Sequence, residues 1–543
     1  MLRIIIVLPL ILWLSGCSSL TTLKGNVAYQ GKDLKKTYYQ VSIKSFDETT
    51  IAATVFQPRI SSLENAPLII HAHGIGVFRI SSHFSLYPLA VLSGESAMKA
   101  WKDGYWVISY DSRGHGGSDG KVSMMNPETE VRDVSAIIDW AVENIPNLKR
   151  DENDYSIGMI GESYGGGVQL LASVFEPRID AIVPITTWYD LNMAMDQEMP
   201  KSLWGMGLYA ATQIGTGFDV DSDLSDFFQH GMTNELTEAD ALMLSKRSLA
   251  HYCDTDMLPN SDALLIQGFT DTMLSVDHAL KSRDCFLKAG KDVRTLLMRN
   301  GHHMPLVESV SRQPFFSNDK YINCDKTPKK SVDVVLNWWD LKLRGKSELD
   351  ETVPEFCVSI SDNEGIDPTE GKQKIETYDV AKSSVSSGFS GMNEWLFQPI
   401  DAVSDLLRWG EDHDSLEEEK KGGFFRPLFI PLKKAQFAQY VYGAPKIHAN
   451  LKSVRGNPLV FVGLGLKRKS KSLVSLVDYQ IQAVSGEGEH SINLPTVTAK
   501  LLEGDTIGLL VYGSHPHYMF RTSFLPNETF IAGKLEIPFV EFQ

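Results

Sequence analysis

Apolar segments of strand length alternate with amphipathic helical patterns from residue 67 to residue 343, and this constrains the fold more than any other feature. The segments with the length of buried strands are Pro67–Ala72, Tyr105–Tyr110, Tyr155–Ile160, Asp180–Ile185, Ala263–Phe269 and Val293–Met298. The clearest helical patterns are Pro127–Glu143 and Lys330–Leu343. Such alternation is typical of a mostly parallel sheet with helices on both faces. We therefore predict an α/β fold, preceded by a hairpin of Tyr38–Phe46 and Thr50–Pro58.

Two stretches depart from this alternation. Residues 190–256 lie between two predicted strands, are rich in Met, Trp and Asp, and are predicted to form a helical cap over the carboxyl edge of the sheet. Beyond residue 346 the chain is first polar and then contains short alternating segments separated by turns, which is typical of an all-β sandwich. The predicted strands there are Phe437–Val441, Pro458–Leu464, Val474–Ala483, Ile507–Val511 and Phe530–Phe539. We predict an α/β domain from 37–189 and 257–346, and a β-rich C-terminal domain from 347–543.

Size and charge set broad limits on the class of protein. The chain has 543 residues, of which 43% are hydrophobic, so it is long enough for two or three domains with their own cores. Its formal net charge of -16 argues against a nucleic-acid partner.

The N-terminus has the pattern of an export signal. Arg3 precedes the apolar run Ile4–Leu14, and Leu14-Ser-Gly-Cys17 follows. This ending resembles the bacterial lipobox, in which the cysteine is lipidated, so residues 1–16 are predicted to be a lipoprotein signal peptide and 17–36 a tether. Ser18, rather than aspartate, after Cys17 favours the outer membrane. The alternative is an ordinary signal peptide whose cleavage site contains a cysteine.

The remaining cysteines are Cys253, Cys285, Cys324 and Cys357. Their spacing matches no zinc pattern. In an exported protein they can form disulfides, for which three pairings exist, and buried free thiols are an equal alternative.

The segment Gly161-Glu-Ser163-Tyr-Gly165 fits the nucleophile-elbow pattern G-x-S-x-G. An apolar strand precedes it and a helical pattern follows at once, as the motif requires. Glycines are needed because a Cβ beside so sharp a turn would collide with the other arm. We predict Ser163 as a nucleophile.

A serine nucleophile needs a base and an acid, which follow it in the order Asp and then His in α/β-hydrolases. Asp271 stands just after one predicted strand, and His302 stands just after the next. We predict Asp271 as the acid and His302 as the base, with Asp277 and His303 as the respective alternatives. Ser163, Asp271 and His302 all lie at carboxyl ends of predicted strands, where open α/β sheets place their sites, whereas Asp277 lies inside the helical pattern that follows.

The oxyanion hole is predicted to combine the main-chain N–H of Tyr164 with that of Ile75, or of Gly74 as the alternative. Ile75 lies in the loop His71-Ala-His73-Gly-Ile-Gly. His71 and His73 stand two apart on a strand, which packing explains as well as metal binding does. No metal or cofactor is predicted.

These residues resemble the X-prolyl dipeptidyl peptidase and cocaine-esterase family of α/β-hydrolases. The matching stretches are Asp111-Ser-Arg-Gly-His-Gly-Gly-Ser118, Gly158-Met-Ile-Gly-Glu-Ser-Tyr-Gly-Gly-Gly167, Asp180-Ala-Ile-Val-Pro, Ile266-Gln-Gly-Phe-Thr-Asp271 and Gly301-His302. The resemblance implies an α/β-hydrolase sheet, a cap, a jelly-roll-like C-terminal domain, and the roles of Ser163, Asp271 and His302 given above. The loop Asp111–Ser118 is predicted to be structural, with Asp111 and Arg113 tying the strand end. Two differences are the His-Gly-x-Gly loop, where cocaine-esterase-like members use a tyrosine hydroxyl, and the lack of a recognisable acidic motif for a peptide amine.

We therefore predict a lipid-anchored serine hydrolase that cleaves small esters or amides through an acyl-enzyme in the bacterial cell envelope, facing the periplasm or the exterior. Its partners would be a small-molecule or short-peptide substrate and the membrane that holds the anchor. One alternative is an X-prolyl dipeptidyl peptidase, and another is a non-catalytic surface lipoprotein that binds an envelope component. The oligomeric state stays open.

Overall fold

The structure is a computed structural model. It describes residues 34–61, 64–85, 91–151, 154–195, 201–233, 236–299, 303, 321–324, 328–361, 364–387, 427–471, 474–518 and 527–542.

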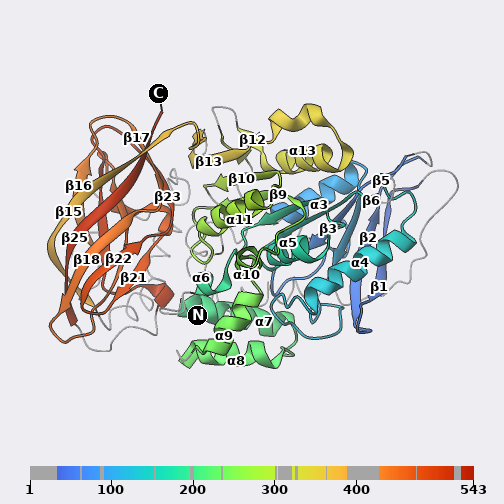
Figure 1. Cartoon of the computed structure of the whole chain (residues 1–543), viewed down its shortest axis with the longest axis horizontal. Helices are drawn as coiled ribbons and strands as arrows, with labels where there is room; N and C mark the ends of the chain where they lie inside the picture. Colours follow the sequence, from blue (N-terminus) through green and yellow to red (C-terminus); the bar gives the residue numbers. More distant parts are fainter. Residues whose placement is uncertain are drawn as a thin grey trace.

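A ten-stranded sheet forms the centre of the α/β part, drawn from blue to yellow in Figure 1. Its order is β1-β2-β4-β3-β7-β8-β9-β10-β13-β14. The strands are β1 (Thr37–Lys44), β2 (Thr50–Gln57), β3 (Leu68–Ala72), β4 (Trp106–Tyr110), β7 (Ile157–Glu162), β8 (Ala181–Ile185), β9 (Asp262–Gly268), β10 (Val293–Met298), β13 (Phe356–Ser361) and β14 (Glu364–Ile366). The run from β4 to β13 is parallel, while β1, β2 and β14 pair in antiparallel fashion. The predicted α/β class and its apolar strands are confirmed.

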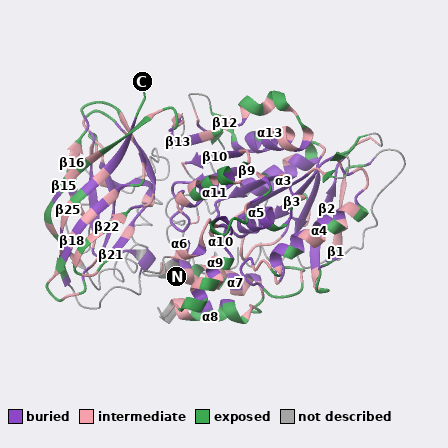
Figure 2. Cartoon of the chain, viewed as in Figure 1, coloured by how far each residue is buried: buried purple, intermediate pink, exposed green. Residues whose placement is uncertain are grey.

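Helices cover both faces of this sheet (Figure 1). The helices α4 (Glu130–Asn144) and α5 (Tyr164–Phe175) share a core with Leu68 and Ile70, whereas α3 (Leu92–Lys102) and α13 (Ser331–Arg344) share a core with Ile69. Successive side chains of a strand point to opposite faces, so a strand between two helical layers must be apolar throughout. Figure 2 shows these strands as buried along their length. This explains why the strands appear in the sequence as continuous apolar runs.

The sheet extends further along the chain than predicted. We expected the α/β unit to end at residue 346, but β13 pairs in parallel with β10 and β14 pairs with β13. Arg294 of β10 helps to hold the segment that precedes β13. Its guanidinium donates to the carbonyl oxygens of Asp350 (2.9 Å) and Val353 (2.5 Å). The strand pairing of the α/β sheet therefore continues to Ile366, beyond the predicted boundary at residue 347.

Helices fill the predicted cap segment between β8 and β9. They are α6 (Leu191–Met195), α7 (Ser202–Gly215), α8 (Ser222–Thr233), α9 (Glu238–Lys246) and α10 (Leu249–Asp254). Helix α7 packs on the loop that follows β3, where a Cβ on Gly76 would lie 2.8 Å from the carbonyl oxygen of Ala211. The cap helices thus lie at the carboxyl edge of the sheet (Figure 1).

The C-terminal part is a sandwich of two antiparallel sheets, drawn in orange and red in Figure 1. One sheet has the order β22-β18-β25-β17-β23 with β15 on β25, and the other has the order β16-β24-β19-β20 with β21 on β19. The strands are β15 (Lys372–Ser387), β16 (Leu428–Lys434), β17 (Gln439–Gly443), β18 (Lys446–Ser453), β19 (Leu459–Lys467), β20 (Val474–Leu476), β21 (Gln482–Ser485), β22 (Gly488–Asn493), β23 (Val497–Leu501), β24 (Thr506–Tyr512) and β25 (Asn527–Glu541). A shared core joins the sheets. The predicted strand Val474–Ala483 is wrong in one respect, because the 3₁₀ turn η2 (Val477–Tyr479) interrupts it.

Two disulfides link segments that are about 30 residues apart in the chain. Cys253 at the end of α10 is bonded to Cys285 in α11 (Asp277–Lys288), and Cys324 is bonded to Cys357 in β13. The structure thus selects one of the three possible pairings. Within the described ranges, no helix is both long enough and apolar enough to cross a membrane.

Candidate active site

Ser163 occupies the junction between β7 and α5, in the backbone conformation that a nucleophile elbow requires. Its φ is 53° and its ψ is -113°, a combination that a non-glycine residue adopts only under constraint. The N–H of Ser163 donates to the carbonyl oxygen of Ile185 (3.0 Å), and its carbonyl oxygen accepts from the Thr187 hydroxyl (2.9 Å). The neighbouring strand β8 therefore holds the strained residue in place.

The flanking glycines make this turn possible. A Cβ on Gly161 would lie 2.5 Å from the carbonyl oxygen of Ala72, and one on Gly165 would overlap the same oxygen. Both distances are far below any real carbon–oxygen contact, so β3 can approach the elbow only where side chains are missing. The close approach of β3 thus explains why the motif has glycine at both positions.

Asp271 follows β9 and is fully buried. Its Oδ1 accepts hydrogen bonds from the N–H groups of Met273 (2.9 Å) and Leu274 (2.7 Å). Its Oδ2 accepts from Nδ1 of His303 (2.7 Å), and the Gln267 amide lies 3.4 Å from the same oxygen. One oxygen is thus held by main chain, and the other is directed at a histidine.

The histidine that meets Asp271 is His303, whereas the sequence favoured His302. His302 lies outside the described residues. The two histidines are adjacent in the chain, and the residue pattern alone does not reveal which of them meets the acid. The hydrogen bond to Asp271 therefore favours the alternative, His303, as the base.

The surroundings of His303 favour its protonated form. Burial opposes protonation, but the charge of Asp271 and its hydrogen bond outweigh burial and raise the pKa of the imidazole above its usual value. The carboxylate of Glu162, next to Ser163 in the chain, adds to this effect, so the histidine lies within electrostatic reach of the elbow. The indole of Trp204 in the cap meets the imidazole edge-on, with ring centroids 6.3 Å apart.

The loop that follows β3 lies against the elbow. A Cβ on Gly74 would be 4.0 Å from the Cβ of Ser163. His73 holds the loop, because its Nδ1 lies 2.6 Å from the carbonyl oxygen of Gly74 while its Nε2 accepts from the N–H of Ser112 (3.0 Å). This loop carries Ile75, the predicted second oxyanion donor.

Three other buried histidines, on β3, in the loop that follows it and in the Asp111–Ser118 loop, have depressed pKa values. Burial lowers the pKa of His71 to about 3, that of His73 to about 4 and that of His115 to about 3. These imidazoles are neutral at physiological pH. The described residues contain no group of three or more His, Cys, Asp or Glu side chains that could hold a metal ion.

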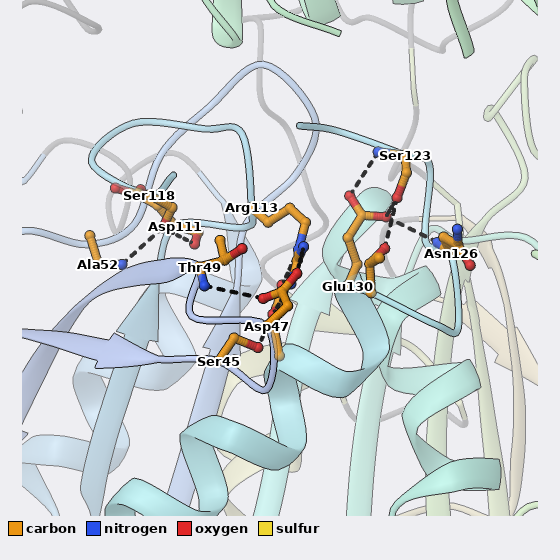
Figure 3. Close-up of polar contacts among 12 residues, drawn as sticks. Ser45, Asp47, Thr49, Ala52, Asp111, Arg113, Ser118, Ser123, Asn126 and Glu130 are labelled. Carbon is orange, nitrogen blue, oxygen red and sulfur yellow. Dashed lines mark hydrogen bonds and ion pairs between the residues drawn. The ribbon is translucent and has the colours of Figure 1, made fainter. Parts of the chain in front are cut away.

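Tyr164 follows Ser163, and its side chain is hydrogen-bonded to helix α4. Its hydroxyl donates to the buried carboxylate of Glu130 (2.5 Å), which also accepts from the N–H groups of Ser123 (3.3 Å) and Asn126 (3.1 Å; Figure 3). Burial raises the pKa of Glu130, although these hydrogen bonds oppose the rise. The side chain of Tyr164 is thus bonded to α4. Its main-chain N–H lies in the first turn of α5, where helical N–H groups lack intrahelical acceptors.

The loop Asp111–Ser118 has the structural role that the sequence predicted. The guanidinium of Arg113 forms ion pairs with Asp47 and Asp133, each at 2.7 Å, and the first pair is drawn in Figure 3. Asp111 accepts from the N–H of Gly117 (2.8 Å) and forms a buried ion pair with Arg79. These contacts tie the end of β4 to its neighbours.

The alternative acid, Asp277, faces another partner. Its carboxylate accepts from the N–H (3.0 Å) and hydroxyl (2.5 Å) of Thr496 in the C-terminal part.

Three residues that the sequence did not predict also contact the site: Gln267, Trp204 and Gln480. No local motif marks them, because they act through contacts with residues that are distant in the chain.

Comparisons with known proteins agree with this geometry. A family model described as X-Pro dipeptidyl-peptidase (S15 family) matches residues 47–305. An uncharacterized 31.7 kDa protein of the traX-finO intergenic region of Escherichia coli is 32% identical over 101 residues, which are 18% of this chain and 33% of that protein. The chain thus spans about a third of the length of this curated relative.

Solved structures resemble the whole chain. An aminopeptidase from the marine sediment archaeon Thaumarchaeota archaeon has a TM-score of 0.63 at 15% identity and covers 96% of this chain and 100% of its own. A CocE/NonD family hydrolase from Staphylococcus aureus has a TM-score of 0.62 at 11% identity, covering 93% and 94%. An α-amino acid ester hydrolase has a TM-score of 0.60 at 13% identity, covering 96% and 100%. At these identities the likeness establishes the fold.

The elbow, the sheet order and the family match agree with the resemblance found in the sequence: over residues 47–305 the chain carries the pattern of the X-Pro dipeptidyl-peptidase (S15) family of hydrolases.

Proposed function

We propose that the protein is a serine hydrolase that cleaves small esters or amides through an acyl-enzyme, with Ser163 as nucleophile, His303 as base and Asp271 as acid. The observation that carries the proposal is the Asp271–His303 pair at the edge of the sheet where strained Ser163 emerges. Ser, Asp and His then follow in the chain order that α/β-hydrolases use.

The reaction begins when Oγ of Ser163 attacks the acyl carbonyl and His303 takes the hydroxyl proton. The bond to the leaving group breaks as the imidazolium returns that proton to the departing alcohol or amine. Water, deprotonated by the same histidine, then attacks the acyl carbonyl; the bond to Oγ of Ser163 breaks, the acid leaves, and the imidazolium returns the proton to Oγ. The carboxylate of Asp271 binds Nδ1–H, which leaves Nε2 free to accept the proton and stabilises the charged imidazolium.

The oxyanion is proposed to accept hydrogen bonds from the main-chain N–H groups of Tyr164 and Ile75, with Gly74 as the alternative. Two features support this assignment. The N–H of Tyr164 lies at the N-terminus of α5, and the Gly74 loop lies against Ser163. Each such donor contributes about 3 kcal/mol to lowering the barrier in a site that excludes water.

Two classes of substrate, esters and X-Pro peptides, are each favoured by a different observation. The ester alternative is favoured by the His-Gly-x-Gly loop. The structural relatives include both an α-amino acid ester hydrolase and an aminopeptidase. The peptidase alternative, cleavage after an X-Pro dipeptide, is favoured by the family model that matches residues 47–305.

We further propose that Cys17 carries a lipid anchor and that the protein resides in the bacterial outer membrane. The two disulfides support export, because such bonds persist in oxidising compartments. Mass spectrometry of the protein extracted from membranes tests this: it should find a lipidated Cys17 at the N-terminus. A soluble protein that retains residues 1–16 would contradict the proposal.

The substrate class is tested with purified protein. Turnover of p-nitrophenyl acetate and of a Gly-Pro p-nitroanilide is compared for the wild type and Ser163→Ala. We expect ester turnover that disappears in the variant, while faster anilide turnover would favour the peptidase. If neither substrate is turned over by the wild type and no organophosphonate reacts with Ser163, the proposed activity is wrong.

A further inference from the structure

The C-terminal β-sandwich reaches into the α/β part at the loop that carries Asp271. The amide of Gln480, which lies between η2 and β21, donates one hydrogen bond to the carbonyl oxygen of Phe269 (2.7 Å) and another to that of Asp271 (2.9 Å). Gln480 is buried and lies 211 residues along the chain from Phe269. From these contacts we propose that Gln480 is a positioning residue for the reaction, which fixes the main chain of the acid so that its side chain faces the histidine.

The chemistry of a primary amide suits this task. Its nitrogen carries two N–H groups, and the loop after β9 presents two buried carbonyl oxygens to it. A buried carbonyl that loses its donor costs about 1–3 kcal/mol, so the loop is most stable where both bonds can form. Asp271 is then held twice, by Gln480 at its main chain and by Met273 and Leu274 at Oδ1.

The turn that presents Gln480 is itself constrained. Asp478 and Tyr479 have φ values of 52° and 57°, which non-glycine residues adopt at a cost of about 1–3 kcal/mol each. The carboxylate of Asp478 accepts from the N–H of Thr498 (2.6 Å). A Cβ on Gly463 would lie 2.6 Å from the carbonyl oxygen of Gln480, so β19 also approaches the turn closely. Strain of this kind persists only where surrounding contacts enforce it, which supports a role for this turn beyond connecting two strands.

The consequence is that the proposed active site depends on both parts of the chain. Loss of the Gln480 bonds would let the loop with Asp271 shift relative to His303, which follows β10. The carboxylate would then orient the imidazole less well, and misplacement by about 1 Å can cost about 100-fold in rate. Binding of a small ester would change little, because Gln480 contacts the acid loop and not the elbow.

The inference rests on the proposed function and is tested with the full chain. Gln480→Met removes both donors at similar volume, and Gln480→Glu keeps the shape but loses the paired N–H groups. Thr496→Val is the matched control, because it removes another hydrogen bond between the two parts, from the Thr496 hydroxyl to Asp277 (2.5 Å). Active sites are counted by fluorophosphonate labelling, so that rates refer to folded, competent protein.

We expect both Gln480 variants to lower kcat on p-nitrophenyl acetate by about 10-fold or more, with KM within about twofold. The acidic limb of their kcat/KM profile should move to lower pH, because a weaker pair with Asp271 favours the imidazolium less. Thr496→Val should change neither quantity. Wild-type kcat and an unmoved acidic limb in both Gln480 variants would overturn the inference, whereas an unlabelled wild type would overturn the proposed function instead.

Discussion

His303 Nδ1 lies 2.7 Å from Oδ2 of Asp271, a carboxylate that is wholly removed from solvent. The two residues follow β9 and β10, which are adjacent parallel strands. Parallel neighbours end at the same edge of a sheet, so a pair of residues 32 positions apart in the chain is brought together by the pairing of these strands. The hydrogen bond to Asp271 favours His303 over its neighbour His302 as the base.

His303→Ala should abolish turnover of p-nitrophenyl acetate, with kcat lowered by about 10³-fold or more, since the base and the leaving-group acid are lost together. His302→Ala is the natural comparison and should retain kcat within about tenfold. Steady-state kinetics of both purified variants decide between them. A complete loss in His302→Ala combined with an active His303→Ala would restore the assignment favoured by sequence.

The pH dependence of kcat/KM reports the same pair. The base must be neutral to accept a proton, and Asp271 raises the pKa of His303, so the midpoint of the acidic limb should lie above the usual histidine value of about 6.5. Asp271→Asn removes the charge that favours the imidazolium. This variant should therefore shift the limb to lower pH and reduce kcat by about 10³- to 10⁴-fold. A limb that stays in place in Asp271→Asn would show that another group titrates.

Much of this site follows from local sequence, and the remainder depends on contacts between distant segments. Ser163 and Asp271 could be located because an apolar strand precedes each one and the strand order places both at one edge. The choice of His303 over its neighbour depends on which side chain meets Asp271, and the residue pattern does not give that direction. Gln480 has no local signal, because its role comes from a hydrogen bond across 211 residues. The pairing of β13 with β10 could not be predicted either, because a short strand does not reveal its pairing partner.

The elbow should tolerate no side chain at Gly165, where a Cβ would overlap the carbonyl oxygen of Ala72. We expect Gly165→Ala to lower the free energy of unfolding by about 2 kcal/mol or more and to abolish labelling of Ser163. Gly207 in α7 serves as the control, because a Cβ added there would meet no heavy atom within 4 Å. Gly207→Ala should be neutral or stabilising by up to about 1 kcal/mol. Urea unfolding of both variants measures the difference, and equal stabilities would contradict the close packing of β3.

The strained turn that presents Gln480 should make stability depend on pH. Burial raises the pKa of Asp478 to about 6, although the charge of Arg299 and the Thr498 hydrogen bond oppose the rise. The folded state therefore binds this proton more tightly than the unfolded chain, whose carboxyl has a pKa of about 3.9. Its contribution to stability is present below about pH 4 and is lost as the pH rises through about 6.

Asp478→Asn removes that dependence while an asparagine still tolerates the positive φ and can accept from Thr498. Relative to the wild type, the variant should gain up to about 2 kcal/mol of unfolding free energy between pH 4 and pH 7. Urea unfolding at both pH values measures this difference. A constant difference across the range would show that the carboxyl does not titrate with folding.

Covalent labelling shows whether Ser163 is the nucleophile. The wild-type protein is treated with a fluorophosphonate, digested and analysed by mass spectrometry. We predict a single phosphonylated serine, Ser163, and no labelling in Ser163→Ala. Labelling that persists in Ser163→Ala, or a wild type that remains unlabelled, would contradict the account.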